Sequence, residues 1–215
     1  MPARLPRRFF ARDVLAVAPD LLGCTVSHAG VTVRITETEA YAGELGDPGS
    51  HAFRGWTPRT APMFGPAGAT YVYFTYGMHW MLCLVTGRVD GAQAVLVRAG
   101  EVVAGHDVAA GRRPGVRERD WCRGPARLAT TLALDGSHTG RDFCTPRRES
   151  AGPPIDLVVR AAPEPVAPHL MRTGPRVGVS GPGGDGAAYP WRFWIDGEPT
   201  VSTYRPGVAR RRVTR

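Results

Sequence analysis

The chain of 215 residues contains no lysine, and all 27 of its basic residues are arginine. No side-chain amine is therefore available for Schiff-base chemistry, which leaves only the chain's own amino terminus, at Pro2 if Met1 is removed. The net charge is nevertheless +8. An arginine-rich, lysine-free composition is typical of GC-rich coding, but that bias does not by itself produce a surplus of positive charge. The surplus indicates a polyanionic partner, and arginine is suited to binding phosphate through two hydrogen bonds.

Cysteine is scarce, with four residues at Cys24, Cys83, Cys122 and Cys144. No two of them form a Cys-x-x-Cys pair, and no histidine lies at a metal-ligand spacing from them. The sequence therefore predicts no structural zinc site. We expect four reduced thiols in a cytoplasmic protein.

Long apolar runs are also missing. The best stretches, 70–75 and 78–85, are interrupted and fall far short of the roughly 20 residues that a membrane span needs. The basic residues at the beginning of the chain are not followed by an apolar segment, so we expect no secretory signal. The length predicts one domain over 1–215, with 205–215, which holds five arginines, as a flexible basic arm.

The remaining pattern is mixed and mostly β. A helix is expected at 13–22, with Asp13 as its N-cap and Pro19 inside it, and a second helix begins at Gly124-Pro125 and continues to 134. Gly/Pro-rich or polar stretches predict irregular segments at 42–69, 105–119 and 135–154; the first is expected to be ordered and functional, the other two mobile. Alternating β-branched and aromatic residues predict strands at 24–28, 31–41, 70–76, 79–86, 93–99, 176–180 and 191–196.

The strand at 31–41 carries two carboxylates. A period of two places Ile35, Glu37, Glu39 and Tyr41 on one face. Two carboxylates and a phenol at the end of a strand, next to a long loop, can perform acid–base chemistry. Since buried carboxylates are rarely unpaired, one of the two can instead serve as the partner of an arginine.

An aromatic cluster follows at 71–80. Tyr71 and Tyr73 alternate onto one face, and Tyr76 precedes a glycine that permits a turn. Such side chains can stack on bases or wedge between them, although strand aromatics more often belong to a core. In the loop before this cluster, Thr57 and Arg59 flank a proline, and such residues can hold phosphates.

In order along the chain, these segments resemble one family, the alkyladenine type of 3-methyladenine DNA glycosylase. The resemblance covers residues 5–204, and motifs in the right order are far more specific than any one of them. The matching segments are ITETEAY at 35–41, SHA at 50–52, TPR at 57–59, MF at 63–64, GATYVYFTYGM at 68–78, AVLVRA at 94–99, GP at 124–125 and RVGV at 176–179.

The resemblance implies an α+β fold, with a curved, mainly antiparallel sheet and peripheral helices. It implies a monofunctional enzyme of base excision repair, acting as a monomer without metal or organic cofactor. Its substrate would be double-stranded DNA with alkylated or deaminated purines, such as 3-methyladenine, 7-methylguanine, hypoxanthine and ethenoadenine. In this reading Glu39 activates the attacking water, and Arg98 and the carbonyl of Val177 help to hold it.

The resemblance also implies residues that bind DNA. Tyr41, His51 and Tyr73 would sandwich the flipped base, while Tyr76 would insert into the minor groove and fill the vacated space. Electron-rich tyrosine rings can hold a cationic purine by cation–π attraction. Further DNA contacts are expected at Thr57, Arg59 and Met78.

One position departs from the family pattern. The family usually has an asparagine in the strand after the Tyr-Gly-Met motif, and the aligned residue here is Cys83. The resemblance places that amide against the base pocket, where it crowds the 2-amino group of normal guanine. Cysteine is smaller and a weaker donor, so we expect altered purine discrimination.

Two other readings stay open at this point. The first is a bifunctional glycosylase-lyase that uses Pro2; enzymes of that kind beginning Met-Pro continue with an acidic residue and carry a C-terminal zinc finger, whereas Ala3 follows here and no Cys-pair finger is present. The second is a non-catalytic nucleic-acid-binding β-barrel, whose basic surface and aromatic side chains only bind.

Overall fold

Eight strands form one antiparallel sheet in the computed structural model, which describes residues 2–43, 46–145 and 155–208. The strand order is β3-β4-β5-β2-β1-β6, with β8 also paired to β2 and β7 paired to β8. This arrangement confirms the expected α+β fold with a mainly antiparallel sheet. The strands are β1 (Thr25–His28), β2 (Val31–Ala42), β3 (Thr70–Thr75), β4 (His79–Thr86), β5 (Gln93–Ala104), β6 (Val158–Arg160), β7 (Met171–Gly174) and β8 (Arg192–Ile195).

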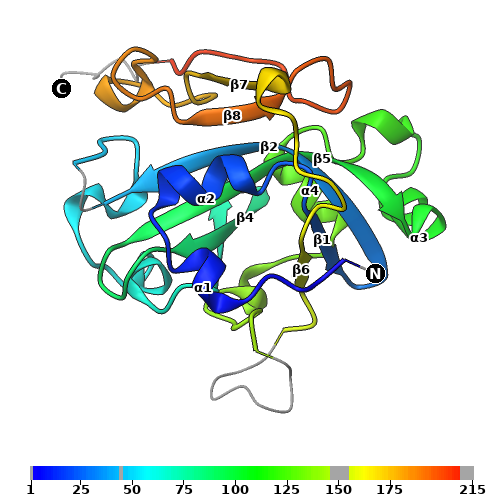
Figure 1. Cartoon of the computed structure of the whole chain (residues 1–215), viewed down its shortest axis with the longest axis horizontal. Coiled ribbons are helices and arrows are strands. Elements are labelled where there is room, and N and C mark those ends of the chain that lie inside the picture. Colours follow the sequence, from blue (N-terminus) through cyan, green and yellow to red (C-terminus); the bar gives the residue numbers. More distant parts are fainter. Residues whose placement is uncertain (1, 44–45, 146–154, 209–215) are drawn as a thin grey trace.

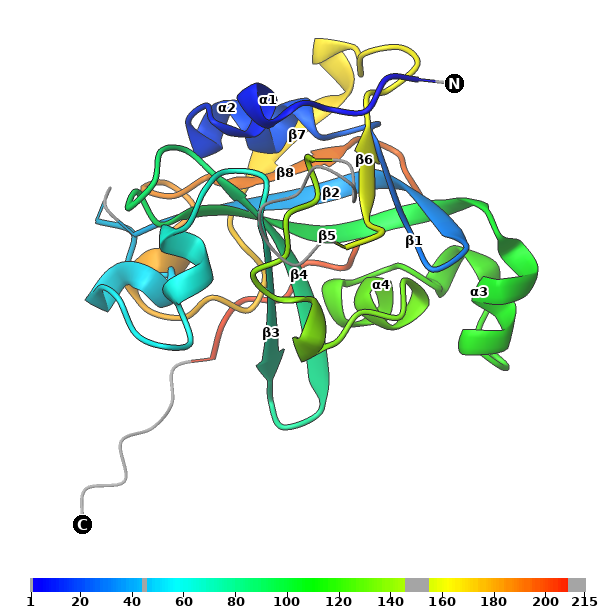
Figure 2. The ribbon, with the colours of Figure 1, turned by 90° about the horizontal axis from the view of Figure 1, so that it is seen from below.

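The four short α-helices of the described ranges lie at the periphery of the sheet. Figure 2 shows α1 and α2 on one side of β2 and β5, with α3 and α4 on the other side, and Figure 1 shows β7 and β8 beyond β2. Within the described ranges, no helix combines the length and the apolar character needed to cross a membrane. The helices are α1 (Arg7–Phe10), α2 (Val14–Asp20), α3 (His106–Arg112) and α4 (Pro125–Thr131).

The two predicted helices are confirmed, with shorter bounds. Asp13 caps α2 because its side chain accepts a hydrogen bond from the N–H of Leu15. Pro19 lies inside the helix, which ends one residue later. Pro125 begins α4, where its missing N–H costs no helical hydrogen bond.

A bulge in β2 changes which side chains face the core. The register of β2 against β5 shifts between Ile35 and Glu37, and the opposite edge of β2 pairs first with β1 and then, at residues 37–39, with β8. One inserted residue reverses the alternation of a strand. Ile35 consequently lies in the main hydrophobic core, while Glu37, Glu39 and Tyr41 remain together on the other face. The prediction that Ile35 shares their face is wrong.

Other expectations also need correction. Residues 106–112 form α3 rather than an irregular segment. No strand forms at 176–180; the nearest strand is β7, which ends at Gly174. Neither the four-residue α1 nor the three-residue β6 was predicted, because both are too short to produce a periodic pattern. All four cysteines are free thiols, as expected. Predictions for 146–154 and 209–215 lie outside the described residues.

Candidate active site

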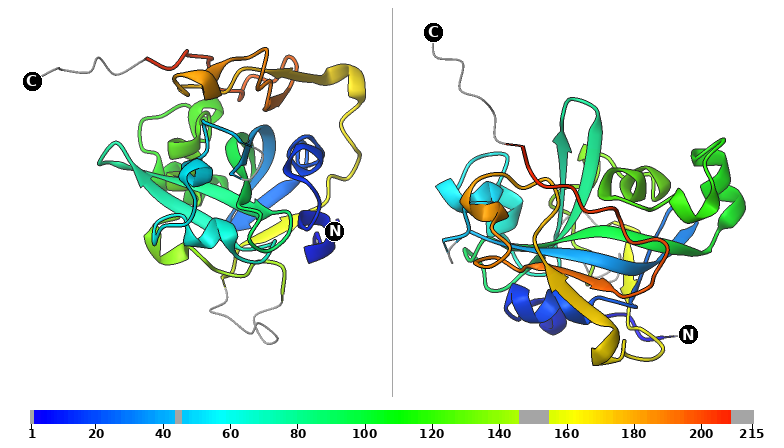
Figure 3. Two further views of the ribbon diagram at one scale, coloured as in Figure 1. Left: turned by 90° about the vertical axis from the view of Figure 1, so that its left-hand side faces the viewer. Right: turned by 90° about the horizontal axis from the view of Figure 1, so that it is seen from above.

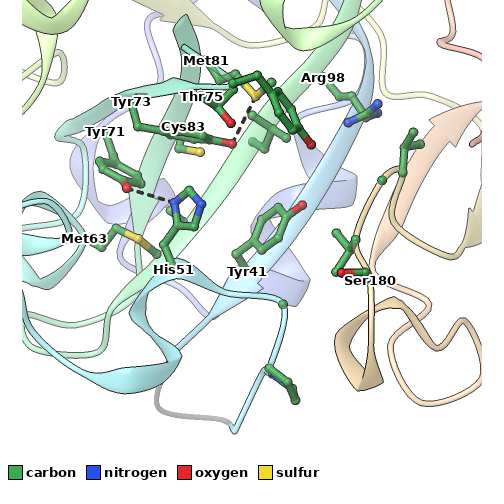
Figure 4. A pocket seen from close by; sticks show the side chains of 18 residues that line it. Tyr41, His51, Met63, Tyr71, Tyr73, Thr75, Met81, Cys83, Arg98 and Ser180 are labelled. Atoms are coloured by element: carbon green, nitrogen blue, oxygen red, sulfur yellow. Dashed lines mark hydrogen bonds between the residues drawn. The ribbon is translucent and has the colours of Figure 1, made fainter. Parts of the chain in front are cut away.

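A pocket of about 310 Å³ opens between the sheet and a C-terminal segment that follows β7. Its size lies at the lower end of the range of small-ligand sites. Figure 4 shows Tyr41, His51 and Tyr73 projecting into it from β2, the 51–54 turn and β3, with Ser180 on the facing wall. This wall is remote in sequence from β2 and β3. The right-hand view of Figure 3 shows that the C-terminal segments, in orange and red, run back along β2.

Two carboxylates stand behind the pocket, and their surroundings differ. Glu37 is fully buried and accepts hydrogen bonds from Arg192 Nε at 2.6 Å and from the N–H of Ser202 at 2.7 Å. It also lies 3.1 Å from Arg98 Nε. Glu37 therefore serves as a partner of two arginines, which is one of the two roles that the sequence left open.

Glu39 is equally buried, but its contacts are residues of the pocket. Its Oε1 accepts a hydrogen bond from the N–H of Val177 at 2.7 Å, and its Oε2 accepts one from the hydroxyl of Tyr41 at 2.8 Å. Arg98 Nε lies 3.5 Å from Oε1. Val177, Tyr41 and Arg98 all line the pocket. Each carboxylate oxygen retains a second lone pair, which can accept a hydrogen bond from a substrate or a water.

The protonation of the groups around Glu39 is fixed by burial and charge. Burial and the negative charge of Glu39 raise the pKa of Tyr41 well above its usual value, so its hydroxyl remains the donor. Burial alone would lower the pKa of Arg98, but the carboxylates of Glu39 and Glu37 more than offset this and raise it. The site is therefore a carboxylate held between a phenol, a backbone N–H and a permanent cation.

Three aromatic rings form the side of the pocket nearest β3. Tyr71 and Tyr73 stack with their ring centres 5.1 Å apart, and His51 meets Tyr73 edge-on at 4.7 Å. His51 Nδ1 lies 3.0 Å from the Tyr71 hydroxyl. Desolvation of the imidazole in the pocket wall, followed by the charge of Arg59, lowers the pKa of His51 to about 4, so the imidazole is neutral at physiological pH. Tyr71 was not among the predicted pocket residues, although its place in the alternation with Tyr73 could have revealed it.

The β3–β4 hairpin carries the predicted wedge. Tyr76 and Gly77 have φ of 53° and 68° and Met78 donates to the carbonyl of Thr75, which makes a type I′ turn. Figure 2 shows this hairpin extending away from the body of the sheet. Its tip places two large apolar side chains in solvent, since Tyr76 is 74% exposed and Met78 is 67% exposed.

The predicted phosphate-binding loop lies beside this hairpin. Thr57 and Arg59 are both exposed. The hydroxyl of Thr57 lies 2.9 Å from that of Thr60, and Arg59 donates a hydrogen bond to the carbonyl of Phe74 on β3. The loop is thus fastened to the hairpin while its polar groups remain accessible.

Cys83 lies on the floor of the pocket. It is opposite Tyr71 on β3 and Leu96 on β5, and only 4% of its surface is exposed. Burial and the charge of Glu39 raise the pKa of its thiol, so the side chain is neutral. It therefore presents a small uncharged surface at the place where the resemblance expects an amide.

A second, wider groove adjoins the pocket and was not predicted. The two share Tyr76, Arg98 and Val177 in their walls. Burial, together with repulsion from the charge of Arg127, lowers the pKa of Arg113 in this groove. The net charge was the only sequence signal for the groove, whose arginines include three from 113–127 and one from 205: Arg113, Arg123, Arg127 and Arg205.

The two alternative readings find little support in this geometry. The carbonyl of Pro2 accepts a hydrogen bond from Arg160 of β6, at the opposite edge of the sheet from β3. The described strands form an open sheet, with β3 and β6 as its two ends, and not a closed barrel. Among the described residues no group of three or more His, Cys, Asp and Glu side chains is arranged to hold a metal ion.

Comparison with known proteins decides the family. Residues 8–199 match the family model of methylpurine-DNA glycosylase. The chain belongs to the methylpurine-DNA glycosylase family. Two relatives, both named "Putative 3-methyladenine DNA glycosylase", are 50% identical to it: one from Streptomyces avermitilis, over 99% of this chain and 98% of its own length, and one from Frankia casuarinae, over 92% of each. A relative of the same name from Burkholderia cenocepacia is 41% identical over 95% of this chain and 93% of its own.

Membership in this family makes the chain a DNA glycosylase of DNA repair, an enzyme that hydrolyses N-glycosyl bonds. DNA is accordingly its substrate, which agrees with the surplus of positive charge in the sequence. The pocket and the groove beside it are therefore the candidate sites for this activity.

Proposed function

We propose that this glycosylase is monofunctional and that it flips alkylated or deaminated purines into the pocket, where Glu39 activates the water that cleaves the N-glycosidic bond. The observation that carries the proposal is the position of Glu39, a fully buried carboxylate hydrogen-bonded to two groups that line the pocket, Tyr41 and Val177. The substrates are the 3-methyladenine, 7-methylguanine, hypoxanthine and ethenoadenine class. The enzyme acts as a monomer.

The chemistry of the step suits these groups. Cleavage of an N-glycosidic bond develops positive charge on the sugar, which a nearby carboxylate stabilises while it orients water. Arg98 and the carbonyl of Val177 hold that water in this proposal, and both residues line the pocket beside Glu39. A positioned general base contributes on the order of 10²–10⁴ in rate.

Flipping is assigned to the exposed groups around the pocket. Rotating a base out of the duplex costs a few kcal/mol, and Tyr76 at the tip of the hairpin offsets part of it by filling the vacated space. Tyr41, His51 and Tyr73 then enclose the base, and Cys83 meets it from the floor. Positioning contacts to DNA come from three exposed residues: Thr57, Arg59 and Met78.

A base-release assay tests the function. Duplexes containing hypoxanthine or 7-methylguanine are incubated with the protein, and free base is measured by chromatography; we expect release of both, leaving intact abasic strands. Salt-dependent binding without release would overturn the enzyme reading in favour of a binding module. A covalent adduct after borohydride treatment on abasic DNA would overturn the monofunctional reading.

A further inference from the structure

Asp47 and Arg176 form an ion pair that is completely buried behind the pocket. Asp47 lies in the loop that follows β2, and Arg176 lies two residues after β7. Both guanidinium Nη atoms donate to the carboxylate, at 2.6 and 2.7 Å, and neither side chain has any exposed surface. Two dry charges are stable only when each is matched and hydrogen-bonded.

The pair joins chain segments that form the wall of the pocket. Arg176 also donates to the carbonyls of Ala40 on β2 and Gly183, at 3.0 and 2.8 Å. Asp47 in turn accepts from the N–H of Gly49 at 2.9 Å. A Cβ atom at Gly49 would clash with Arg176 Nη2, so the backbone itself packs against the guanidinium.

The pair is also adjacent to the reacting groups. The residue after Arg176 is Val177, whose N–H donates to Glu39. Arg176 Cζ lies 4.5 Å from the centre of the Tyr41 ring, and Tyr189 and Trp191 complete the surroundings of the guanidinium at 5.6 and 5.5 Å. The guanidinium thus contacts the ring that also lines the pocket.

A bare cation in this place would interfere with recognition. A tyrosine ring attracts a cation through its negative face, but a guanidinium against the same ring opposes the approach of a second cation. Asp47 cancels that charge at a distance of 2.6 Å. Charge interactions in a dry interior are strong, so the cancellation matters for any charged base that Tyr41 contacts.

We propose that Asp47 and Arg176 are positioning residues that keep the backbone of Val177 hydrogen-bonded to Glu39. Because the two charges cancel, the pair also lets the ring of Tyr41 accept cationic as well as neutral purines. This deepens the proposed function and rests on it. The pair sets the balance between positively charged lesions, such as 7-methylguanine, and neutral ones, such as hypoxanthine.

The test compares two variants, each of which removes one charge of the pair and leaves the other without its partner. Asp47→Asn leaves the guanidinium uncompensated, and we expect the ratio of 7-methylguanine to hypoxanthine excision to fall about three- to tenfold, the range of a cation–π interaction. Arg176→Gln leaves the carboxylate, and the ratio should rise. The double variant removes both charges and should restore the wild-type ratio, even where its overall rate is lower. Asp196→Asn, in the exposed pair with Arg172, is the matched control and should change nothing.

The readouts separate the possible failures. Single-turnover excision and dissociation constants are both measured for each lesion, with thermal unfolding to establish that each variant is folded. Equal loss on both lesions, or a shift of the same sign in both single variants, would overturn the charge-balancing role. If Asp47→Asn does not fold, Arg176→Gln and the double variant still decide it. A wild-type protein that binds without releasing base would defeat the proposed function, and the ratio of dissociation constants would still test the pair.

Discussion

The region behind the pocket and the groove beside it differ in how their charges are balanced. Behind the pocket, all the charges are buried and matched, three carboxylates against three guanidiniums: Glu37, Glu39 and Asp47 with Arg98, Arg176 and Arg192. In the groove beside the hairpin the arginines outnumber the acids. Arg123 and Arg127 both approach Asp120, at 3.6 and 3.8 Å.

The difference follows from solvation. A charge removed from water is tolerated only with a partner, so a buried network must be balanced and its geometry becomes fixed. Exposed arginines keep their hydration, and their surplus is available for the phosphates of DNA. The first region can therefore orient chemistry, and the second can attract a polyanion without specifying its sequence.

The largest effect is expected at Glu39, the buried carboxylate that is hydrogen-bonded to residues of the pocket wall. Glu39→Gln keeps an acceptor for the N–H of Val177 but removes the base. We expect lesion-containing DNA to bind as before and single-turnover excision to fall on the order of 10²–10⁴-fold. Retained excision would move the role of the base elsewhere, with Glu37 as the first candidate.

The same substitution at Glu37, two residues earlier on β2, should reduce stability rather than catalysis. Glu37→Gln leaves Arg192, and in part Arg98, without a matching charge in the interior. We expect the free energy of unfolding, measured in denaturant, to drop by about 3–5 kcal/mol. Glu101→Gln removes an exposed partner of Arg34 and serves as the control, with an expected loss of about 0–1 kcal/mol. Equal losses in the two variants would break the distinction between buried and exposed charge.

Local patterns in the sequence were sufficient for much of this architecture. A strand at 31–41, a cap at Asp13 and a proline at the start of α4 are each specified by a few neighbouring residues, and each formed as predicted, although the bulge interrupts the alternation of the strand. The pairing of Glu37 with Arg192 spans 155 residues, and no local pattern reports it. The bulge in β2 is likewise a long-range feature that no local pattern reports, since it lies where the neighbour of the strand changes from β1 to β8.

The two wrongly assigned segments, 106–112 and 176–180, have separate physical reasons. Glycines and prolines around α3 concealed a helix that has Asp107 in its first turn, where a negative charge favours the helix dipole. At 176–180 the β-branched residues favoured a strand, but the backbone N–H groups make tertiary hydrogen bonds instead of pairing with a neighbouring strand. The N–H of Val177 donates to Glu39, and that of Gly178 donates to the carbonyl of Arg205.

A smaller effect is expected in the unbalanced groove. Arg127→Gln removes one partly exposed cation of α4. We expect DNA affinity to weaken similarly for all sequences, and the slope of log affinity against log salt to become shallower by about 1. Stability should change by less than about 0.5 kcal/mol. Arg172→Gln, an exposed arginine on β7 outside the groove, is the control. An unchanged slope in Arg127→Gln would remove α4 from the proposed path of the DNA.

The least change in overall binding and rate is expected from a neutral side chain of the pocket itself. Cys83 lies on the pocket floor near Glu39, and its thiol carries no charge because burial raises its pKa. Cys83→Asn adds volume and an amide donor without altering the charge balance, so it should change which neutral edges of a purine fit. We expect the ratio of hypoxanthine to 7-methylguanine excision to shift on the order of tenfold, as for one added group in a pocket. The salt dependence of binding should stay the same. An unchanged ratio would show that shape at this position does not select the base and would leave the charges behind the pocket as the source of discrimination.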